Sequence, residues 1–451
     1  MHTSSLLTDL YQLTMLQGYV DQSMDEIAVF EFFVRKLPRE RNFFMAAGLA
    51  QVVDYLETLA FDQNDLDYLA GDDRFHPDFL DYLADLRFTG DVHAMAEGTI
   101  FFPDEPIIRI TAPISQAQLI ETRVINVLQF QTMIASKAAR MTLVAPEKLL
   151  VDFGLRRAHG AEAGLFAARA SYLAGFTGTS TVLAGKMYSI PVFGTMAHSF
   201  IQAHDSETLA FEHFAESQPD NVVLLIDTYD TEKGADKVVA LAPRLAERGI
   251  TIKGVRLDSG DMIIHAKKVR RILDQGGLTD VRILTSGNLD EYKLAEFSQA
   301  NAPIDGFGVG TRMTTSADAP YLDCAYKLVE YAGIARRKRS EGKATWPGRK
   351  QVFRSIDTRG RMCGDVLTLE SDALTGTPLI ESVMKQGQCI AAGPPEMKKI
   401  REYAFSQLAG LPDYLMQLNE GEKYPVEISE PLAELAQKVD LRSRADARRP
   451  S

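Results

Sequence analysis

The sequence predicts an α/β protein: an irregular or incomplete α/β (TIM-like) barrel, accompanied by an α+β domain built from the N-terminal and C-terminal segments. Three observations predict this fold class. Short apolar runs alternate with helix-period segments between about residues 148 and 310, as in a parallel sheet with crossover helices. The segments on either side mix strand and helix patterns without this alternation. The chain has 451 residues, 45% of them hydrophobic, an ordinary globular composition with room for two or three domains.

The central part of the chain contains seven apolar runs, most of them β-branched or leucine-rich with little alternation, as expected for strands covered on both faces. The runs are residues 148–153, 179–183, 190–194, 222–227, 252–258, 281–286 and 306–310. Helix-period segments at 232–248 and 261–275 separate several of them. Seven strands exceed the need of a small open sheet, so we expect a closed or nearly closed barrel; a doubly wound open sheet is the alternative.

The two flanking parts of the chain predict the α+β domain. In the first 115 residues, strands are expected at 28–34, 91–97 and 107–111, and helices at 51–59 and 77–86. After Tyr321, strands are expected at 326–331, 351–356 and 362–369, with a helical C-terminus from Glu396 onward. We therefore expect an N-terminal α+β domain over residues 1–115, a catalytic barrel over 116–325, and a C-terminal segment over 326–451 that packs back on the N-terminal domain.

Charge and apolar patterning exclude several classes of protein. The 49 Lys and Arg against 61 Asp and Glu give a net charge of −12, which disfavours a sequence-independent nucleic-acid binder. No Lys or Arg precedes Arg35, so neither a secretory signal nor a transit peptide is expected. The longest strand-like apolar run, 222–226, is far too short to cross a bilayer. These observations predict a cytoplasmic protein that binds neither nucleic acid nor membrane.

Two further features have ordinary structural interpretations. Cys324, Cys363 and Cys389 are scattered and odd in number, which disfavours a disulfide framework or a structural zinc site, and we expect buried thiols. Residues 336–350 contain seven basic residues and one acid, Glu341. A solvated loop is the preferred interpretation of this basic run, and a contribution to a phosphate site is the alternative.

Polar residues follow the predicted strands, at the edge where α/β barrels build active sites. Arg156 and Arg256 could each fix one anionic group through a planar guanidinium, although a structural ion pair is also open. Two glycine turns could bring backbone N–H groups close to a phosphate, or could be plain tight turns. These turns are Ser286-Gly287-Asn288 and Gly308-Val309-Gly310-Thr311.

Two acids and one histidine complete the candidate set. Asp258 and Asp261 flank a strand-to-helix turn, where carboxylates could accept ribose hydroxyls or hold Mg²⁺ through water, or where one could cap the next helix. His198 follows a predicted strand and could be a nucleophile or base, although a single loop histidine is more often structural. From these residues alone, the sequence predicts an enzyme that acts on a phosphorylated, ribose-like substrate.

The order and spacing of these motifs make the sequence similar to the nicotinate phosphoribosyltransferases, in the type II phosphoribosyltransferase group. The resemblance covers about three quarters of the chain. The segments that carry it are Leu7-Thr8-Asp9-Leu10-Tyr11-Gln12-Leu13-Thr14-Met15, Phe153-Gly154-Leu155-Arg156-Arg157, Gly194-Thr195-Met196-Ala197-His198-Ser199, Arg256-Leu257-Asp258-Ser259-Gly260-Asp261, Ser286-Gly287-Asn288-Leu289-Asp290, Gly308-Val309-Gly310-Thr311 and Tyr326-Lys327-Leu328-Val329.

The resemblance implies a reaction and a set of partners. Nicotinate and 5-phosphoribosyl 1-pyrophosphate would give nicotinate mononucleotide and pyrophosphate, the first step of NAD salvage from nicotinate. Hydrolysis of ATP would be coupled to this transfer through a phosphohistidine, in a ligase-type reaction, and Mg²⁺ would accompany the pyrophosphate. The enzyme would be a homodimer with shared active sites.

The same resemblance implies roles for individual residues. His198 would be the phosphorylated residue, and Arg256, with Thr195 nearby, would receive the nicotinate carboxylate. Tyr11 and Phe153 would sandwich the pyridine ring, with Tyr11 donated by the partner subunit. Arg156, Asp258, Gly287 and Thr311 would hold the phosphoribosyl pyrophosphate. His198, Arg256 and Asp258 would be the catalytic residues, and the substrate-binding set would also include Ser180, Ser286 and Gly310.

Related activities remain open from the sequence. Nicotinamide-specific relatives carry an acid near the position of Ser180, where none is present here, and this fits a carboxylate ligand. A nicotinamide or quinolinate phosphoribosyltransferase is nevertheless the nearest alternative. A catalytically silent, nucleotide-sensing relative is the alternative from another class.

Overall fold

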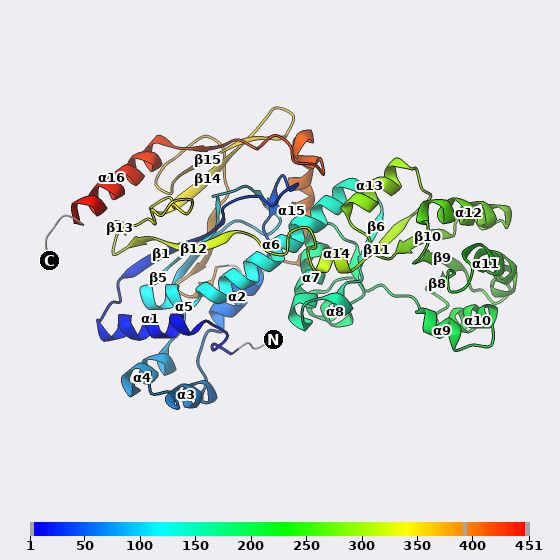
Figure 1. Cartoon of the computed structure of the whole chain (residues 1–451), viewed down its shortest axis with the longest axis horizontal. Helices are drawn as coiled ribbons and strands as arrows, with labels where there is room; N and C mark the ends of the chain where they lie inside the picture. Colours follow the sequence, from blue (N-terminus) through cyan, green and yellow to red (C-terminus); the bar gives the residue numbers. More distant parts are fainter. Residues whose placement is uncertain (1–3, 391–394, 447–451) are drawn as a thin grey trace. The chain divides into compact units, whose positions relative to one another are not determined.

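The computed structural model describes residues 4–390 and 395–446, which form two compact units (Figure 1). The central unit runs from Lys137 to Pro320. The terminal unit combines the residues up to Ser136 with those from Tyr321 onward. Helix α6 (Glu121–Val144) contributes to both units.

A six-stranded parallel sheet, curled into a half-barrel, forms the centre of the central unit. Its strand order is β7-β6-β11-β10-β9-β8. The strands are β6 (Leu149–Asp152), β7 (Gly178–Thr179), β8 (Val222–Leu225), β9 (Ile252–Leu257), β10 (Arg282–Ser286) and β11 (Gly306–Val309). The predicted α/β class is therefore confirmed, whereas the sheet is open, with β7 and β8 at its edges.

Two of the seven predicted strands are wrong in whole or in part. Of the run 179–183, only Thr179 belongs to a strand, because helix α8 (Val182–Tyr188) begins three residues later. The run 190–194 makes a single parallel bridge, Thr179 to Val192, because β7 offers it only two residues to pair with. This bridge lies where a further strand would have extended the barrel beyond β7.

Helices surround the parallel strands of the central unit, and α10, α11 and α12 lie around β8, β9 and β10 (Figure 1). The helices are α7 (Ala161–Leu173), α9 (His198–Gln202), α10 (Glu207–Ser217), α11 (Thr231–Ala246), α12 (Met262–Gln275), α13 (Glu291–Gln299) and α14 (Thr311–Thr314). Aspartates cap three of them: Asp230 accepts from the Lys233 N–H, Asp261 from Ile263 and Ile264, and Asp290 from Lys293. Each cap fixes the end of a strand-to-helix loop.

The main sheet of the terminal unit takes strands from both ends of the chain, in the order β13-β12-β1-β5-β3-β17-β18. These are β1 (Ile27–Val34), β3 (Asp91–Ala94), β5 (Pro106–Pro113), β12 (Cys324–Tyr331), β13 (Ile334–Ala335), β17 (Glu381–Lys385) and β18 (Gln388–Cys389). β1 pairs antiparallel with β5 on one side and with β12 on the other. Strands from beyond residue 320 thus share a sheet with strands from the first 115 residues.

Two smaller sheets complete the terminal unit, one of order β16-β14-β15-β19 and one formed by β2 and β4. Their strands are β2 (Phe44–Met45), β4 (Ile100–Phe101), β14 (Lys350–Ile356), β15 (Met362–Leu369), β16 (Thr377–Pro378) and β19 (Val426–Ile428). Lys350 of β14 and Glu31 of β1 form a buried ion pair, with 2.7 Å between Nζ and Oε2. This pair ties the second sheet to the main sheet.

The helices of the terminal unit include the predicted ones at 51–59 and 77–86. They are α1 (Leu10–Asp21), α2 (Leu49–Glu57), α3 (Gln63–Ala70), α4 (Pro77–Asp85), α5 (Ile114–Leu119), α15 (Met397–Ala409) and α16 (Glu430–Asp446). The expectation of a helical C-terminus from Glu396 is only partly right, because a short 3₁₀ helix at Asp413–Met416 and strand β19 interrupt it.

The cysteines differ from the prediction of three buried thiols. All three are free; Cys324 and Cys389 are half-buried and Cys363 is exposed. Burial raises the pKa of the Cys324 thiol to about 11, which makes it a poor nucleophile near neutral pH. Within the described part of the chain, none of the helices combines the length and the apolar character that a bilayer crossing needs.

Candidate active site

Except for Tyr11, the predicted site residues lie at or just after strand ends at one edge of the half-barrel. Asp152, the last residue of β6, pairs in register with Thr179 at the end of β7 and with Val309 at the end of β11. Likewise, Leu257 at the end of β9 pairs with Thr285 of β10. Because all six strands are parallel, their carboxyl ends and the loops that follow them meet at this edge.

Arg256 and Phe153 line one cavity of about 50 Å³ inside the half-barrel. The lining is mostly apolar: Leu149, Val151, Phe153, Phe193, Gly194, Thr195, Asn221, Val223, Arg256, Leu284, Thr285, Phe307 and Gly308. The Phe153 ring packs on Gly308 so closely that a Cβ there would lie 2.5 Å from it. This cavity pairs an aromatic face with a cation, which suits a small aromatic acid.

The Arg256 guanidinium is held by the segment before α9. Nη1 donates to the Thr195 hydroxyl and Nη2 donates to the Met196 carbonyl, at 3.0 Å. The buried Nε has no hydrogen-bond partner among the described residues. Burial lowers the pKa of Arg256, the nearby acids Asp258 and Asp227 oppose this shift, and Arg156 adds to it. Arg256 thus carries a desolvated charge that an anionic ligand would stabilise.

His198 stands at the start of α9 with its two ring nitrogens facing different partners. Nδ1 lies 3.1 Å from the Thr228 hydroxyl, and Nε2 lies 3.9 Å from Oδ2 of Asp258. The side chain is 39% exposed, so a reagent from solvent can reach the ring. The hydroxyl and the carboxylate orient the imidazole between the loops that follow β8 and β9.

Asp258 is fixed by neighbours on both sides. Its Oδ1 accepts a hydrogen bond from the Ser286 hydroxyl at 2.5 Å, and its backbone N–H donates to Oδ2 of Asp227 at 2.8 Å. Asp227 also accepts from the Ser259 hydroxyl at 2.6 Å. The predicted Ser286 and Asp258 are therefore brought together, and Asp227 supports them.

The two glycine turns lie side by side at the ends of β10 and β11. Gly287 has a φ of +100°, and a Cβ there would lie 2.5 Å from the Asp258 carbonyl oxygen. Across the turns, Arg312 donates to the Asn288 side-chain oxygen at 3.0 Å, next to Thr311 at the start of α14. A Cβ at Gly310 would lie 3.0 Å from the Phe153 carbonyl oxygen, so this backbone also approaches closely. Glycine at these two positions therefore lets the backbone pass close to neighbouring carbonyl groups, and glycine turns of this kind can present backbone N–H groups to a phosphate.

The structure places the other predicted residues more loosely. Arg156 is exposed in the 3₁₀ turn Leu155–Arg157, and Ser180 is half-buried, its N–H donating to the Asp152 carbonyl at 2.8 Å. Asp261 caps α12, which was the structural alternative predicted for one of the two acids. Tyr11 belongs to the terminal unit, where it lies near the start of α1 and is 46% exposed.

Sequence reasoning gave no role to three residues that the structure brings into the site. Asp227 and Thr228 follow β8 and contact Asp258 and His198. Asp152 ends β6 and is 1% exposed. The available signal was the position of each residue at a strand end, but the hydrogen-bond partners depend on strands distant in sequence.

The described residues do not form a metal cage by themselves, since no group of three or more His, Cys, Asp and Glu side chains gathers among them. His204 and His213 form only a pair, with 3.1 Å between ring nitrogens. Asp258 and Asp227 do offer oxygen ligands beside the glycine turns. Mg²⁺ usually keeps several waters and binds through one or two carboxylates and the phosphates of its substrate, so these residues fit that ion.

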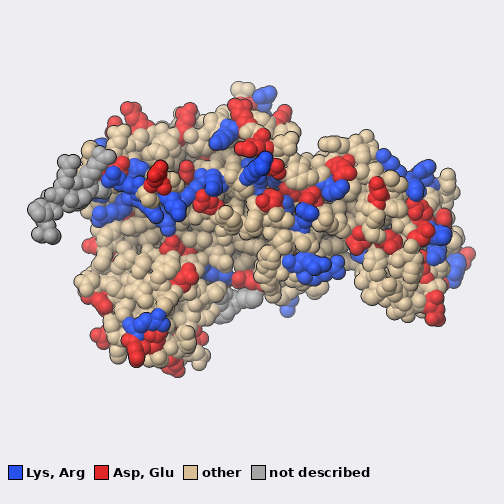
Figure 2. Space-filling model, viewed as in Figure 1, with Lys and Arg blue, Asp and Glu red and all other residues tan. Residues whose placement is uncertain are grey.

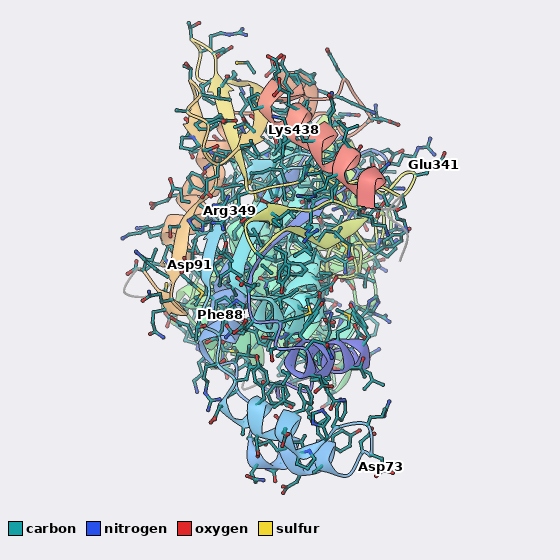
Figure 3. The ribbon with its side chains drawn as sticks, turned by 90° about the vertical axis from the view of Figure 1, so that its left-hand side faces the viewer. Asp73, Phe88, Asp91, Glu341, Arg349 and Lys438 are labelled. Carbon is teal, nitrogen blue, oxygen red and sulfur yellow. The ribbon has the colours of Figure 1, made fainter. Side chains whose placement is uncertain are left out.

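The basic run 336–350 belongs to the terminal unit and is a loop up to Lys350, with Arg336, Lys338, Arg339 and Lys343 exposed as the solvated-loop interpretation predicts. Three other members of the run have fixed partners or are buried. Arg337 lies over the Trp346 ring and 3.7 Å from an Asp440 carboxylate oxygen, and Lys350 is buried against Glu31. Lysine and arginine side chains gather near β13 and α16 (Figure 2). A cleft of about 600 Å³ there includes Arg349 and Lys438 in its lining (Figure 3).

Three family models match the chain in sequence. They describe the N-terminal domain of nicotinate phosphoribosyltransferase at residues 6–129, the nicotinate phosphoribosyltransferase family at 149–338, and its C-terminal domain at 372–436.

Individual relatives match along almost the whole chain. A nicotinate phosphoribosyltransferase of Mycobacterium tuberculosis (pncB2) is 50% identical over 430 residues, 95% of this chain and 92% of its own. One from Bacillus subtilis is 38% identical, covering 94% and 93%. The crystal structure of human nicotinic acid phosphoribosyltransferase superposes with a TM-score of 0.86 at 30% identity, covering 96% of this chain and 100% of that chain. The resemblance seen in the sequence is confirmed: the chain belongs to the nicotinate phosphoribosyltransferase family.

Proposed function

We propose that this protein transfers the phosphoribosyl group of 5-phosphoribosyl 1-pyrophosphate to nicotinate, giving nicotinate mononucleotide and pyrophosphate. The observation that carries the proposal is the cavity in which the Phe153 ring and the Arg256 guanidinium line the same small space. A pyridine ring would stack on Phe153 while its carboxylate pairs with Arg256. The membership of the chain in this family supports the same assignment.

The surrounding residues suit the chemistry of this transfer. Displacement of pyrophosphate from ribose C1 passes through an oxocarbenium-like state, so the protein must align the ring nitrogen and stabilise a polyanionic leaving group. The attacking pyridine nitrogen has no proton to lose, and a strong general base is unnecessary. The glycine turns at Gly287 and Gly310 and the exposed Arg156 would receive the phosphates, and Asp258 would accept ribose hydroxyls. Mg²⁺, when bound, would neutralise part of the pyrophosphate charge.

ATP hydrolysis would be coupled to the transfer through His198. In this proposal the γ-phosphoryl group of ATP moves to the exposed imidazole and ADP leaves; water later releases the group as phosphate. Thr228 supports this role because its contact with Nδ1 leaves Nε2 as the reactive nitrogen. A phosphoryl group there would place negative charge near Asp258, 3.9 Å away, and would favour a different arrangement of these loops.

The site would be completed in a homodimer. Exposed apolar side chains occur on both units: Leu7, Leu10 and Tyr11 near α1, and Val182 and Leu183 on α8. Such residues are typical of a surface that a second subunit covers. Tyr11 of the partner would then stack on the nicotinate face opposite Phe153.

A steady-state assay with nicotinate, nicotinamide and quinolinate, each with and without ATP, tests the function. We expect turnover of nicotinate and stimulation by ATP. Preferred use of nicotinamide or quinolinate, or no turnover of any of the three, would contradict the proposal.

The His198→Ala variant tests the role of the histidine. It should keep some phosphoribosyl transfer but lose the stimulation by ATP. With γ-labelled ATP, an acid-labile phosphate should form on the wild type and not on this variant.

A further inference from the structure

Asp152 is a buried carboxylate without a cation beside it. The residue is 1% exposed at the end of β6. Its partners within the described chain are neutral donors, and no Lys, Arg or His forms an ion pair with it there. Buried carboxylates are normally paired with a cation because desolvation of the charge is costly. Stability alone therefore does not explain why only neutral donors surround the Asp152 carboxylate at the end of this strand.

The donors come from separate loops of the candidate site. Oδ1 accepts from the Gly154 N–H at 2.8 Å, in the loop after β6. Oδ2 accepts from the Thr179 hydroxyl at 2.7 Å, at the end of β7. The Thr314 hydroxyl, in α14 after β11, lies 3.5 Å from Oδ1. One carboxylate thus joins the loop after β6, the end of β7 and helix α14 after β11, at the ends of three neighbouring strands.

The backbone around Asp152 positions Phe153, which is expected to stack on the pyridine ring, and Ser180, which is expected among the substrate-binding residues. The Asp152 carbonyl accepts from the Ser180 N–H at 2.8 Å, and the adjacent Phe153 N–H donates to the Val309 carbonyl at 2.8 Å. We propose that Asp152 is a positioning residue for nicotinate, whose carboxylate holds Phe153 and Ser180 at the spacing that the ring requires. This inference rests on the proposed function and adds a residue to it.

The hydrogen bonds explain why a carboxylate is needed. The Thr179 hydroxyl already accepts from the Thr181 N–H at 3.0 Å, so its own proton points to Asp152. All the partners of the carboxylate therefore donate. An asparagine offers one oxygen and one NH₂ group, and the NH₂ would face a donor on one side. Burial also raises the pKa of Asp152 to about 6, so the ionised form is held at a cost to stability.

The variant Asp152→Asn tests the proposal, with Asp365→Asn as a matched control. Asp365 is also 1% exposed, but it pairs with Arg354 in the terminal unit. For Asp152→Asn we expect the KM for nicotinate to rise about tenfold or more, and the KM for phosphoribosyl pyrophosphate to change less than about threefold. The Tm of this variant should be no lower than that of the wild type. For Asp365→Asn we expect a lower Tm and an unchanged KM for nicotinate. An unchanged KM for nicotinate in Asp152→Asn would overturn the proposal, with or without a loss of Tm.

Two further measurements keep the test decisive. Thr179→Val removes one donor and retains the carboxylate, so it should also raise the KM for nicotinate, but by less than Asp152→Asn does. An unchanged KM in Thr179→Val would count against the proposal.

Amide hydrogen exchange, measured without substrate, should be faster at Gly154 and Ser180 in Asp152→Asn than in the wild type. If the wild type forms no nicotinate mononucleotide but exchange is faster in Asp152→Asn, the proposed function is wrong and the effect of Asp152 on these two segments still stands. Unchanged exchange would refute the positioning itself.

Discussion

At the residue scale, Arg256 sets the choice between an acid and its amide. Its guanidinium is desolvated, and its Nε has no partner among the described residues. Nicotinamide has no carboxylate to pair with this desolvated guanidinium, so we expect its kcat/KM to be lower than that of nicotinate by a factor of about 10⁴. In Arg256→Gln, kcat/KM for nicotinate should fall by roughly 100-fold or more and the discrimination should collapse.

Steady-state kinetics with both substrates checks this prediction. Arg271→Gln is the control, because Arg271 is exposed on α12 and donates only to a backbone carbonyl of its own helix in the described structure. Comparable kcat/KM values for nicotinate and nicotinamide in the wild type would show that Arg256 does not select the carboxylate.

Asp152 gives the protein a defined pH dependence of stability. Its pKa is about 6 in the folded protein against 3.8 for the ordinary carboxyl, so the folded state binds more protons than the unfolded state between these values. The group therefore destabilises the fold fully above pH 6, and this penalty, roughly 3 kcal/mol, disappears as the pH falls toward 4. Chemical denaturation of the wild type and of Asp152→Asn at pH 4, 5, 6 and 7 measures the penalty.

The variant lacks this ionisation, so its free energy of unfolding relative to the wild type should decline as the pH falls from 7 to 4. Constant effects of the substitution cancel in this comparison. A difference that does not vary with pH would mean that Asp152 titrates normally.

At the element scale, the turn after β10 depends on glycine. Gly287 has a φ of +100°, and an added Cβ would lie 2.5 Å from the Asp258 carbonyl oxygen. Gly287→Ala should therefore displace the Asp258 turn and raise the KM for phosphoribosyl pyrophosphate about tenfold or more, at a cost of about 1–3 kcal/mol in stability. Gly277, with a φ of +74° and open space around it, is the matched control.

Gly277→Ala should lower the free energy of unfolding by about 1 kcal/mol and leave the KM for phosphoribosyl pyrophosphate unchanged. The reason is that alanine would strain the backbone at this φ but would meet no close neighbour. Substrate titration and thermal unfolding of both variants separate backbone strain from displacement of the site. Equal KM values in the two variants would refute a role for the close approach at Gly287.

The elements also show where sequence reasoning succeeds. Apolar runs such as the one containing β8 were predicted well, because all four residues of that strand are apolar and buried, as expected for a parallel strand covered on both faces. The run 179–183 failed because β-branched residues occur both in the two-residue β7 and at the start of α8. The hydrogen-bond partners of Asp152 could not be predicted, since only the folded sheet brings Thr179 and Thr314 to it.

At the scale of the whole molecule, the net charge of −12 does not describe the site. Arg156 and Arg256 lie close enough for one to lower the pKa of the other, beside the acids Asp227 and Asp258. The candidate site therefore combines both signs of charge, as expected for a protein that binds anions and a ribose. This local arrangement could be predicted only in part, from strand ends and from the family resemblance.

The proposed sharing of the site between subunits gives the last prediction. Tyr11→Ala and Arg256→Ala homodimers should both be nearly inactive. If Tyr11 serves the half-barrel of the partner subunit, a mixed dimer has one site with both residues intact and one with neither. Random reassortment makes half of the dimers mixed, and half of their sites are active, so the mixture should recover about a quarter of wild-type activity. To measure this value, the two variants are mixed, reversibly dissociated and allowed to reassociate, and the activity of the mixture is then assayed. If Tyr11 instead served its own subunit, every site in the mixture would lack one residue and no activity would return.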